Sequence, residues 1–290
     1  MRDASSRAPR RHSLRLVAAL VVALPVAVGI AYSLAASLGV AGSGAAGLTF
    51  TRLGRVVGAA STWHGLLWTM WTATAATTLA TVGAVAAAMA FRGNRVTDRV
   101  GRALTLLPLP VPHLVAAVLG VWILGQSGMI ARAAFALGFI HAPGQMPPLV
   151  YDRWGAGLIL TMAWKEMAFL ALVASALLAT RAGAAEEAAR TLGASGWTTF
   201  HRVTWPILWR GLMPAVVAVF VFVTGSYEAA VLLAPSNPLA LPLLVAERAT
   251  DPDLARRGDA YVVSLLLFAI GAIAVVAHEH ARARWGPLDA

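Results

Sequence analysis

The chain has 290 residues, of which 59% are hydrophobic and only 12% are charged. Soluble domains are about 45–50% apolar and about 25% charged, whereas the mean hydropathy here is +0.71. These values exclude an ordinary water-soluble globule, because too few polar residues remain to cover a core of this size. We therefore expect the chain to lie in a lipid bilayer.

The basic residues are grouped between apolar runs rather than along one stripe. The formal net charge is +10, and its distribution follows the positive-inside rule and argues against nucleic acid as a partner. The chain has no Cys, which removes disulfides, thiolate catalysis and Cys-ligated zinc. Its single lysine, Lys165, follows Trp164, so it cannot belong to a P-loop. If ATP drives this protein, another chain must bind it.

Six apolar runs are each long enough for a spanning helix, which needs about 20 residues. Long apolar runs without alternation predict helices rather than a membrane barrel. The predicted fold class is therefore an all-α membrane protein with six transmembrane helices. The last run is short, and we expect its helix to begin earlier, near Gly258. The runs are Leu16–Val40, His64–Phe91, Leu104–Gly125, Gly155–Thr180, Gly211–Ala234 and Tyr261–Ala277.

The first run also resembles a signal peptide, because Arg10, Arg11 and Arg15 precede it. Its apolar core of about 25 residues exceeds the 7–15 expected of a signal peptide, so we expect a retained helix, with cleavage as the alternative. With the amino terminus inside, basic residues in the connections are about twice as frequent inside as outside. Both termini are therefore expected in the cytoplasm.

Two connections depart from simple loops. The third run opens with Pro108, Pro110 and Pro112, which lack backbone donors, so we expect regular helix only from about Pro112. The connection from Gln126 to Arg153 contains a short helical pattern starting at Met129. We expect this connection to lie on the outer surface.

The connection between the fourth and fifth runs, Ala182 to Arg210, has the pattern of two short helices. A first helical period ends before Gly193, which stands where a helix C′ residue would. A second follows Ser195, a candidate N-cap, and Pro206 marks the expected bend into the fifth run. The periodic residues are Ala185, Ala188, Ala189 and Leu192 in the first helix, and Trp197, Phe200, Val203 and Ile207 in the second.

This helix-glycine-helix protrusion needs a surface to cover its apolar residues. An interfacial helix pair lying on lipid headgroups is one interpretation, which Trp197, Trp205 and Trp209 would suit. A docking surface for another protein is the other.

The spacing of the protrusion resembles the EAA loop of the permease subunits of binding-protein-dependent type I ABC importers. That family has Glu-Ala-Ala, three residues, Gly, nine residues, then Ile, any residue, Leu and Pro. Here Glu187-Ala188-Ala189, Gly193 and Pro206 stand in the same register. Val203 and Trp205 replace Ile and Leu without changing polarity.

The resemblance implies the type I ABC importer transmembrane-domain fold in a bacterial plasma membrane. The expected organisation is a basic tail (1–15), a first helix and outer loop (16–63), a five-helix core (64–277) with the coupling loop 182–210, and a tail (278–290). The implied partners are ABC ATPase subunits, a second permease subunit, an extracytoplasmic solute-binding protein and membrane lipid. The chain itself would hold no cofactor, because the ATPase subunit binds the ATP.

By the same resemblance, the loop inserts into a cleft of the ATPase. Glu187 would meet a basic group there, Gly193 would permit the turn, and the stretch from Ala194 to Arg202 would fill the cleft. The implied coupling residues are Glu187, Ala188, Ala189, Gly193, Ala194, Ser195, Gly196, Trp197, Phe200, Val203 and Pro206.

Three short stretches are similar to the polyamine, iron and thiamine-type branch of these permeases. They begin at Trp164, Gly225 and Thr250, and in the first Ala168 replaces the Pro of the branch. They indicate a subgroup and name no solute.

Lys165, Glu166, Glu228 and His113 are predicted within spans, where ionisable groups are costly and often mark a solute pathway. The alternatives are a structural ion pair, for example Lys165 with Glu228, or a lysine that snorkels outward. Lys165 and Glu166 point about 100° apart on a helix and should not share a partner.

Other polar residues carry no predicted chemistry. Glu186 is expected to be a solvated helix charge beside Glu187. His278 and His280 are two residues apart and face nearly opposite directions, so no metal site is predicted, and no motif of a hydrolase is present.

Two other function classes compete with the importer. A secondary transporter or channel driven by an ion gradient would need inverted repeats or broken helices around ion sites. A membrane scaffold would not require the spacing from Glu187 to Pro206. That spacing favours the importer permease.

Overall fold

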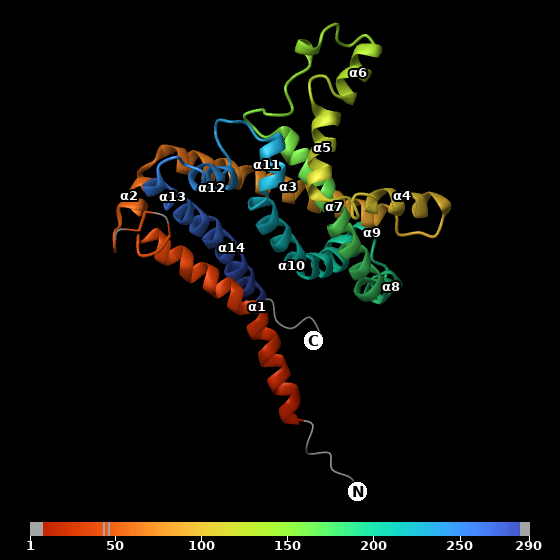
Figure 1. The fold of residues 1–290 in the computed structure, drawn as a ribbon. Helices are drawn as coiled ribbons and strands as arrows, with labels where there is room; N and C mark the ends of the chain where they lie inside the picture. Colours follow the sequence, from red (N-terminus) through yellow and green to blue (C-terminus); the bar gives the residue numbers. More distant parts are fainter. Residues whose placement is uncertain (1–7, 43, 46, 285–290) are drawn as a thin grey trace. The chain divides into compact units, whose positions relative to one another are not determined.

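The computed structural model describes residues 8–42, 44–45 and 47–284, and every regular element in that part of the chain is helical (Figure 1). Residues 1–7 and 285–290 of the two predicted tails lie outside it. Within the described ranges, six helical stretches are long and apolar enough to cross a membrane, which confirms the predicted fold class. They are Ala19–Ser37, Ala60–Ala90, His113–Ala136, Ala156–Thr191, Gly196–Thr224 and Leu254–Arg284.

The chain forms two compact units. The smaller contains residues 1–59 and 245–266, and the larger contains 60–244 and 267–290. The domain boundaries expected from the sequence stay predictions. The smaller unit contains α1 (Ala8–Ser37), α2 (Thr51–Gly58) and α13 (Leu254–Arg257), whereas α12 (Leu241–Ala249) and α14 (Asp259–Arg284) have residues in both units.

The larger unit is built around α3 (Ala60–Ala90) and α7 (Ala156–Leu177), which pack extensively against each other. The α3 face in this core has small residues at four-residue spacing, and Ala76, Ala80 and Ala84 are at most 1% exposed. Small side chains let two helix backbones approach closely, which is how spanning helices associate without a hydrophobic driving force. α10 (Trp205–Thr224) packs on both α3 and α7.

The third predicted span is divided in two. α4 (Val96–Leu106) ends before the three prolines, and α5 (His113–Leu124) begins directly after Pro112, as the missing backbone donors predicted. The short helix expected from Met129 is α6 (Met129–Ala136), and a single 3-10 turn follows at Pro143–Gln145. The span therefore starts later than Leu104.

The fifth and sixth predicted spans also change at their ends. The fifth is interrupted at Gly225 and Ser226, between α10 and α11 (Tyr227–Leu233), where glycine lowers helix propensity. The sixth, α14, starts at Asp259, beside Gly258 as expected.

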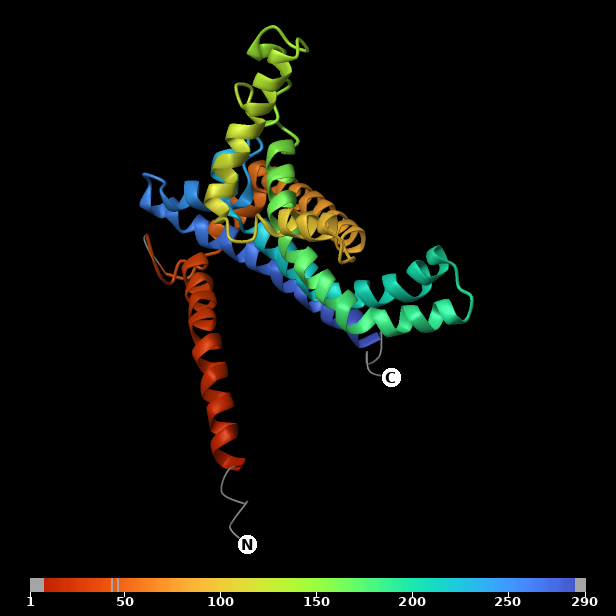
Figure 2. The same cartoon turned by 90° about the vertical axis from the view of Figure 1, so that its right-hand side faces the viewer.

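The fourth and fifth spans each continue into the connection between them. α7 passes through a π-helical turn (η2, Leu178–Ala182) into α8 (Gly183–Thr191), and α9 (Gly196–Thr199) passes through a second π-helical turn (η3, Phe200–Thr204) into α10. Figure 2 shows these segments, coloured green to teal, as the two arms of one hairpin. We call residues 182–210 the coupling hairpin.

The helical path continues through Pro206, where the sequence predicted a bend into the fifth run. The proline lies at the start of α10, directly after the π-helical turn that keeps the path helical. The protrusion is therefore made of two extended spans and not of two separate short helices.

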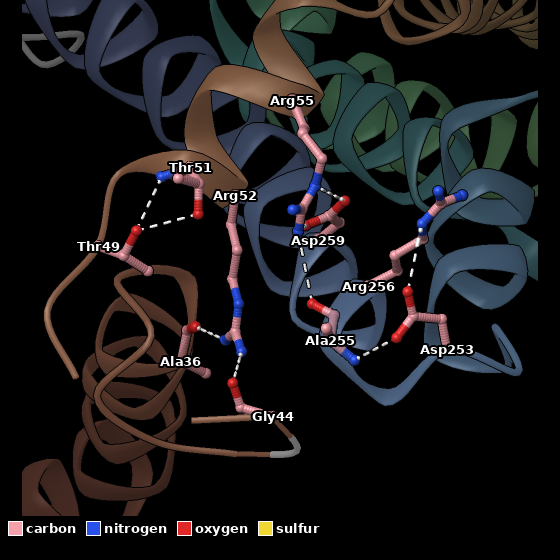
Figure 3. Close-up of polar contacts among 10 residues, drawn as sticks. All are labelled: Ala36, Gly44, Thr49, Thr51, Arg52, Arg55, Asp253, Ala255, Arg256 and Asp259. Atoms are coloured by element: carbon pink, nitrogen blue, oxygen red, sulfur yellow. Dashed lines mark hydrogen bonds and ion pairs between the residues drawn. The ribbon is translucent and has the colours of Figure 1, made fainter. Parts of the chain in front are cut away.

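In the smaller unit, two arginines of α2 form hydrogen bonds or an ion pair with neighbouring segments (Figure 3). Arg52 is 3% exposed and donates hydrogen bonds to the carbonyls of Ala36 and Gly44, so it satisfies a carbonyl in the last turn of α1. Arg55 forms a two-pronged ion pair with Asp259, with nitrogen-to-oxygen distances of 2.8 and 3.1 Å.

Candidate functional site

The tip of the coupling hairpin is a helix C-cap built on Gly193. Its φ is +82°, a left-handed conformation that glycine adopts without steric cost. The N–H of Gly193 donates to the carbonyl of Arg190, and the N–H of Ala194 donates to that of Ala189, both at 3.0 Å. These two bonds form a Schellman motif, which ends α8 as the sequence predicted.

The second arm starts at Ser195, which caps α9. The Ser195 hydroxyl accepts a hydrogen bond of 3.2 Å from the Thr198 N–H, which confirms the predicted N-cap. Trp197 then stacks near Phe200 with ring centroids 6.2 Å apart. The tip is therefore a defined structure with its backbone groups satisfied at both caps.

Several residues of the predicted motif are accessible at this tip. Glu187 is exposed, and the side chains of Leu192 and Trp197 are 89% and 72% exposed. The remaining residues divide between exposed positions, Ala188, Gly193, Ser195 and Gly196, and half-buried positions, Ala189, Ala194, Phe200, Val203 and Pro206. The tip thus presents one carboxylate and two large apolar side chains.

The expectation that Glu186 is solvated is wrong. It is 3% exposed, and its carboxylate forms an ion pair with Arg92 at 2.8 Å. Burial opposes ionisation, but hydrogen bonds from Arg92 and Thr204 and the charges of Arg92 and Arg190 outweigh it and lower the pKa of Glu186.

The position of Glu186 on the helix could have indicated that it is buried. Glu186 falls at helical spacing with Ala182, Ala185 and Ala189, which are buried or half-buried, whereas Ala188 faces outward. Arg92, 94 residues earlier in the chain, has no local pattern that would identify it as the partner.

The ionisable residues predicted at membrane depth do not form one cluster. His113 Nε2 lies 2.9 Å from Glu166 Oε1, and the His113 ring lies 4.4 Å from that of Phe222. Lys165 is 6% exposed and its Nζ lies 3.5 Å from the Leu109 carbonyl oxygen, at the limit of a hydrogen bond. Lys165 and Glu166 thus have different partners, as their helical spacing predicted.

The Lys165–Glu228 ion pair is not found. Glu228 is exposed in the first turn of α11, and no ion pair joins it to Lys165 in the part of the chain that the structure describes. In the same ranges, no group of three or more His, Asp or Glu is placed to hold a metal ion.

Known proteins match this chain in sequence and in fold. Residues 80–285 match the family described as "Binding-protein-dependent transport system inner membrane component". The molybdenum transport system permease protein ModB of Mycobacterium tuberculosis is 30% identical over 60% of this chain and 62% of its own length. The sulfate transport system permease protein CysT of Synechocystis is 27% identical over 56% of this chain and 53% of its own. The chain thus spans about half to three-fifths of these relatives.

A solved structure extends the comparison to nearly the whole fold. A bacterial alginate ABC transporter, in complex with an alginate pentasaccharide-bound periplasmic protein, aligns with a TM-score of 0.74 at 14% identity. The alignment covers 95% of this chain and 93% of that one. At this identity the likeness concerns the fold, which is that of a type I ABC importer transmembrane subunit. Since the family match covers more than half of the sequence, this chain belongs to the family of binding-protein-dependent transport system inner membrane components.

Proposed function

We propose that this chain is the permease subunit of an ATP-driven importer and is coupled to a separate ATPase through the coupling hairpin. The observation that carries the proposal is the tip around Gly193, where Glu187, Leu192 and Trp197 are exposed on two capped helices. Large apolar side chains beside a carboxylate fit a protein cleft with a basic group. The family match supports a transport role for the whole chain.

The structure of the arms supports a mechanical role. α8 and α9 are continuous with α7 and α10 through the π-helical turns, and α7 and α10 pack on α3. A displacement of the tip by the ATPase would therefore move two spanning helices as levers. Alternating access requires this kind of rigid movement between two arrangements of the helices.

The orientation follows from charge. Arg190, Arg202 and Arg210 lie in the hairpin and Arg181 directly precedes it. By the positive-inside rule, such a connection is expected in the cytoplasm together with both termini. An ATPase that uses cytoplasmic ATP would reach it there. The second permease subunit and the solute-binding protein complete the proposed assembly.

The names of the relatives favour an inorganic oxyanion as the solute. ModB is named for molybdenum and CysT for sulfate transport, rather than for the polyamine, iron and thiamine-type branch that the three short stretches resemble. In neutral water, molybdenum is present as molybdate, a tetrahedral dianion like sulfate. The solute would be distinguished by ATP hydrolysis of the assembled importer with molybdate or sulfate, set against spermidine, ferric iron and thiamine.

The proposed coupling is tested by Glu187→Lys, with Glu247→Lys as the matched control. Both carboxylates are exposed, but Glu247 lies on α12, outside the hairpin. Charge reversal at Glu187 should leave membrane insertion and yield intact while abolishing co-purification of the ATPase and solute-stimulated ATP hydrolysis. The control should retain both. Full co-purification and transport with Glu187→Lys would leave the hairpin as a lipid-interfacial pair, and transport that follows an ion gradient without ATP would favour a secondary transporter.

A further inference from the structure

The carboxylate of Glu186 is surrounded by hydrogen-bond donors from three segments of the chain. Oε1 accepts from the Thr204 hydroxyl at 2.6 Å and from Arg92 at 3.1 Å. Oε2 accepts from the second nitrogen of the same guanidinium at 2.8 Å, and an Arg190 nitrogen lies 3.7 Å away. Arg190 also donates to the Glu186 backbone carbonyl at 3.2 Å. We call Arg92, Glu186 and Thr204 the hairpin clasp.

The clasp joins both arms of the hairpin to the end of α3. Glu186 lies in α8 of the first arm, and Thr204 is the last residue of the π-helical turn η3 in the second. Arg92 follows α3, which ends at Ala90. Thr204 is 1% exposed, so its hydroxyl is held inside the junction. Three separate segments are thus tied at one buried carboxylate.

The π-helical turns lie beside the clasp. One precedes α8 and the other contains Thr204, and the two turns are in contact. Such turns widen a helix locally and often mark functional positions. Without the contacts of the clasp, a change of winding at these turns could absorb a movement of the tip, and the movement would not reach the core helices.

Adjacent glutamates therefore have different surroundings. Glu187 is exposed toward the proposed ATPase surface, whereas Glu186 is buried and paired with an arginine beyond the hairpin. Two-pronged arginine-carboxylate pairs fix geometry as well as charge. A solvated carboxylate would have no comparable effect on the direction of the arm.

We propose that Arg92, Glu186 and Thr204 are positioning residues that make the coupling hairpin and α3 move as one body, so that displacement of the tip reaches the core helices. This inference rests on the proposed importer function. α3 is the helix on which α7 and α10 both pack, so its direct tie to the hairpin gives the displacement a second route into the core. Loss of the clasp leaves the tip residues in place and uncouples the arms from α3.

The test compares ATP hydrolysed with solute transported in proteoliposomes that contain the chain with its ATPase and binding protein. Glu186→Gln places an amide donor against the Arg92 guanidinium, and Thr204→Val removes the hydroxyl with little change in shape. Both should bind the ATPase as the original chain does, while transport per ATP falls roughly fivefold or more, within the usual range of coupling between sites. Glu279→Gln, which breaks an exposed ion pair with Arg282, is the matched control and should leave the ratio unchanged.

A conservative variant separates charge from geometry. Arg92→Lys keeps the positive charge but cannot form the two-pronged pair, so its coupling ratio should lie between those of the original chain and Arg92→Ala. If Arg92→Ala folds in low yield, the proposal is tested with Arg92→Lys and Thr204→Val. Normal transport per ATP in these two variants would overturn the proposal.

Chemical cross-linking tests the tie itself. The chain has no Cys, so Arg92→Cys with Glu186→Cys provides two unique thiols, which a short bifunctional thiol reagent can join. The double variant should be uncoupled, and cross-linking should restore most of the transport per ATP. Complete cross-linking without recovery would contradict a mechanical tie. Failure of the original chain to bind an ATPase would refute the importer function, whereas normal coupling in the variants would refute only the clasp.

Discussion

Gly193 offers a quantitative test of the tip. It is replaced by alanine, and Gly196→Ala serves as the matched control. An added Cβ meets no atom within 4 Å at either position, but only Gly193 has a positive φ, of +82°. A non-glycine residue in this region costs about 1–2 kcal/mol. The difference between the two variants therefore isolates the backbone conformation.

The cost converts directly into ATPase binding. If the ATPase accepts only the observed tip, a penalty of about 1–2 kcal/mol lowers its affinity by as much as roughly 5–30-fold. The affinity can be measured by titrating the ATPase onto the chain in lipid nanodiscs. Gly196→Ala should stay close to the original, because alanine is favourable in α9. Equal affinities of the two variants would refute a docking role for this turn.

Three further predictions concern other parts of the chain. Arg92 and Thr204 lower the pKa of Glu186 from its ordinary value of 4.5, so the ion pair stabilises the fold above pH 4.5, and this stability is lost as the pH falls through the lowered pKa. The thermal midpoints of the original chain and of Glu186→Gln should therefore converge at low pH. A difference that stays constant with pH would argue against the pair. Cysteines at Gly93 and Ser195 should react only from the cytoplasm and one at Ser236 only from outside; cytoplasmic labelling at Ser236 would reverse the topology. Glu166→Gln should lower the unfolding midpoint in detergent, because it removes the carboxylate beside His113; an unchanged midpoint would mean that this contact contributes no stability.

Local patterns were sufficient for much of the fold. Long apolar runs located the spans, because a helix must satisfy its backbone groups within lipid. Pro112 fixed the start of α5 through its missing donor, and Gly193 and Ser195 fixed the tip through a cap at each side. Each of these features depends on residues only a few positions apart.

The remaining features depend on contacts that local patterns do not encode. The π-helical turns η2 and η3, which join the hairpin arms to the spans, have no local sequence signature, so this continuity was not predicted. Glu186 resembled a solvated charge because its partner, Arg92, is far away in the chain. The break at Gly225 was hidden within an apolar run that continues into α11.

The central claim is that the coupling hairpin contacts an ATPase, and a single cross-link tests it most directly. Leu192 is 89% exposed beside Gly193, and Leu192→Cys would be the only thiol of the chain. With a photoreactive label at this thiol, the assembled transporter should yield one major cross-link, to the ATPase subunit. Cross-links to lipid alone, with the ATPase present and active, would contradict the account.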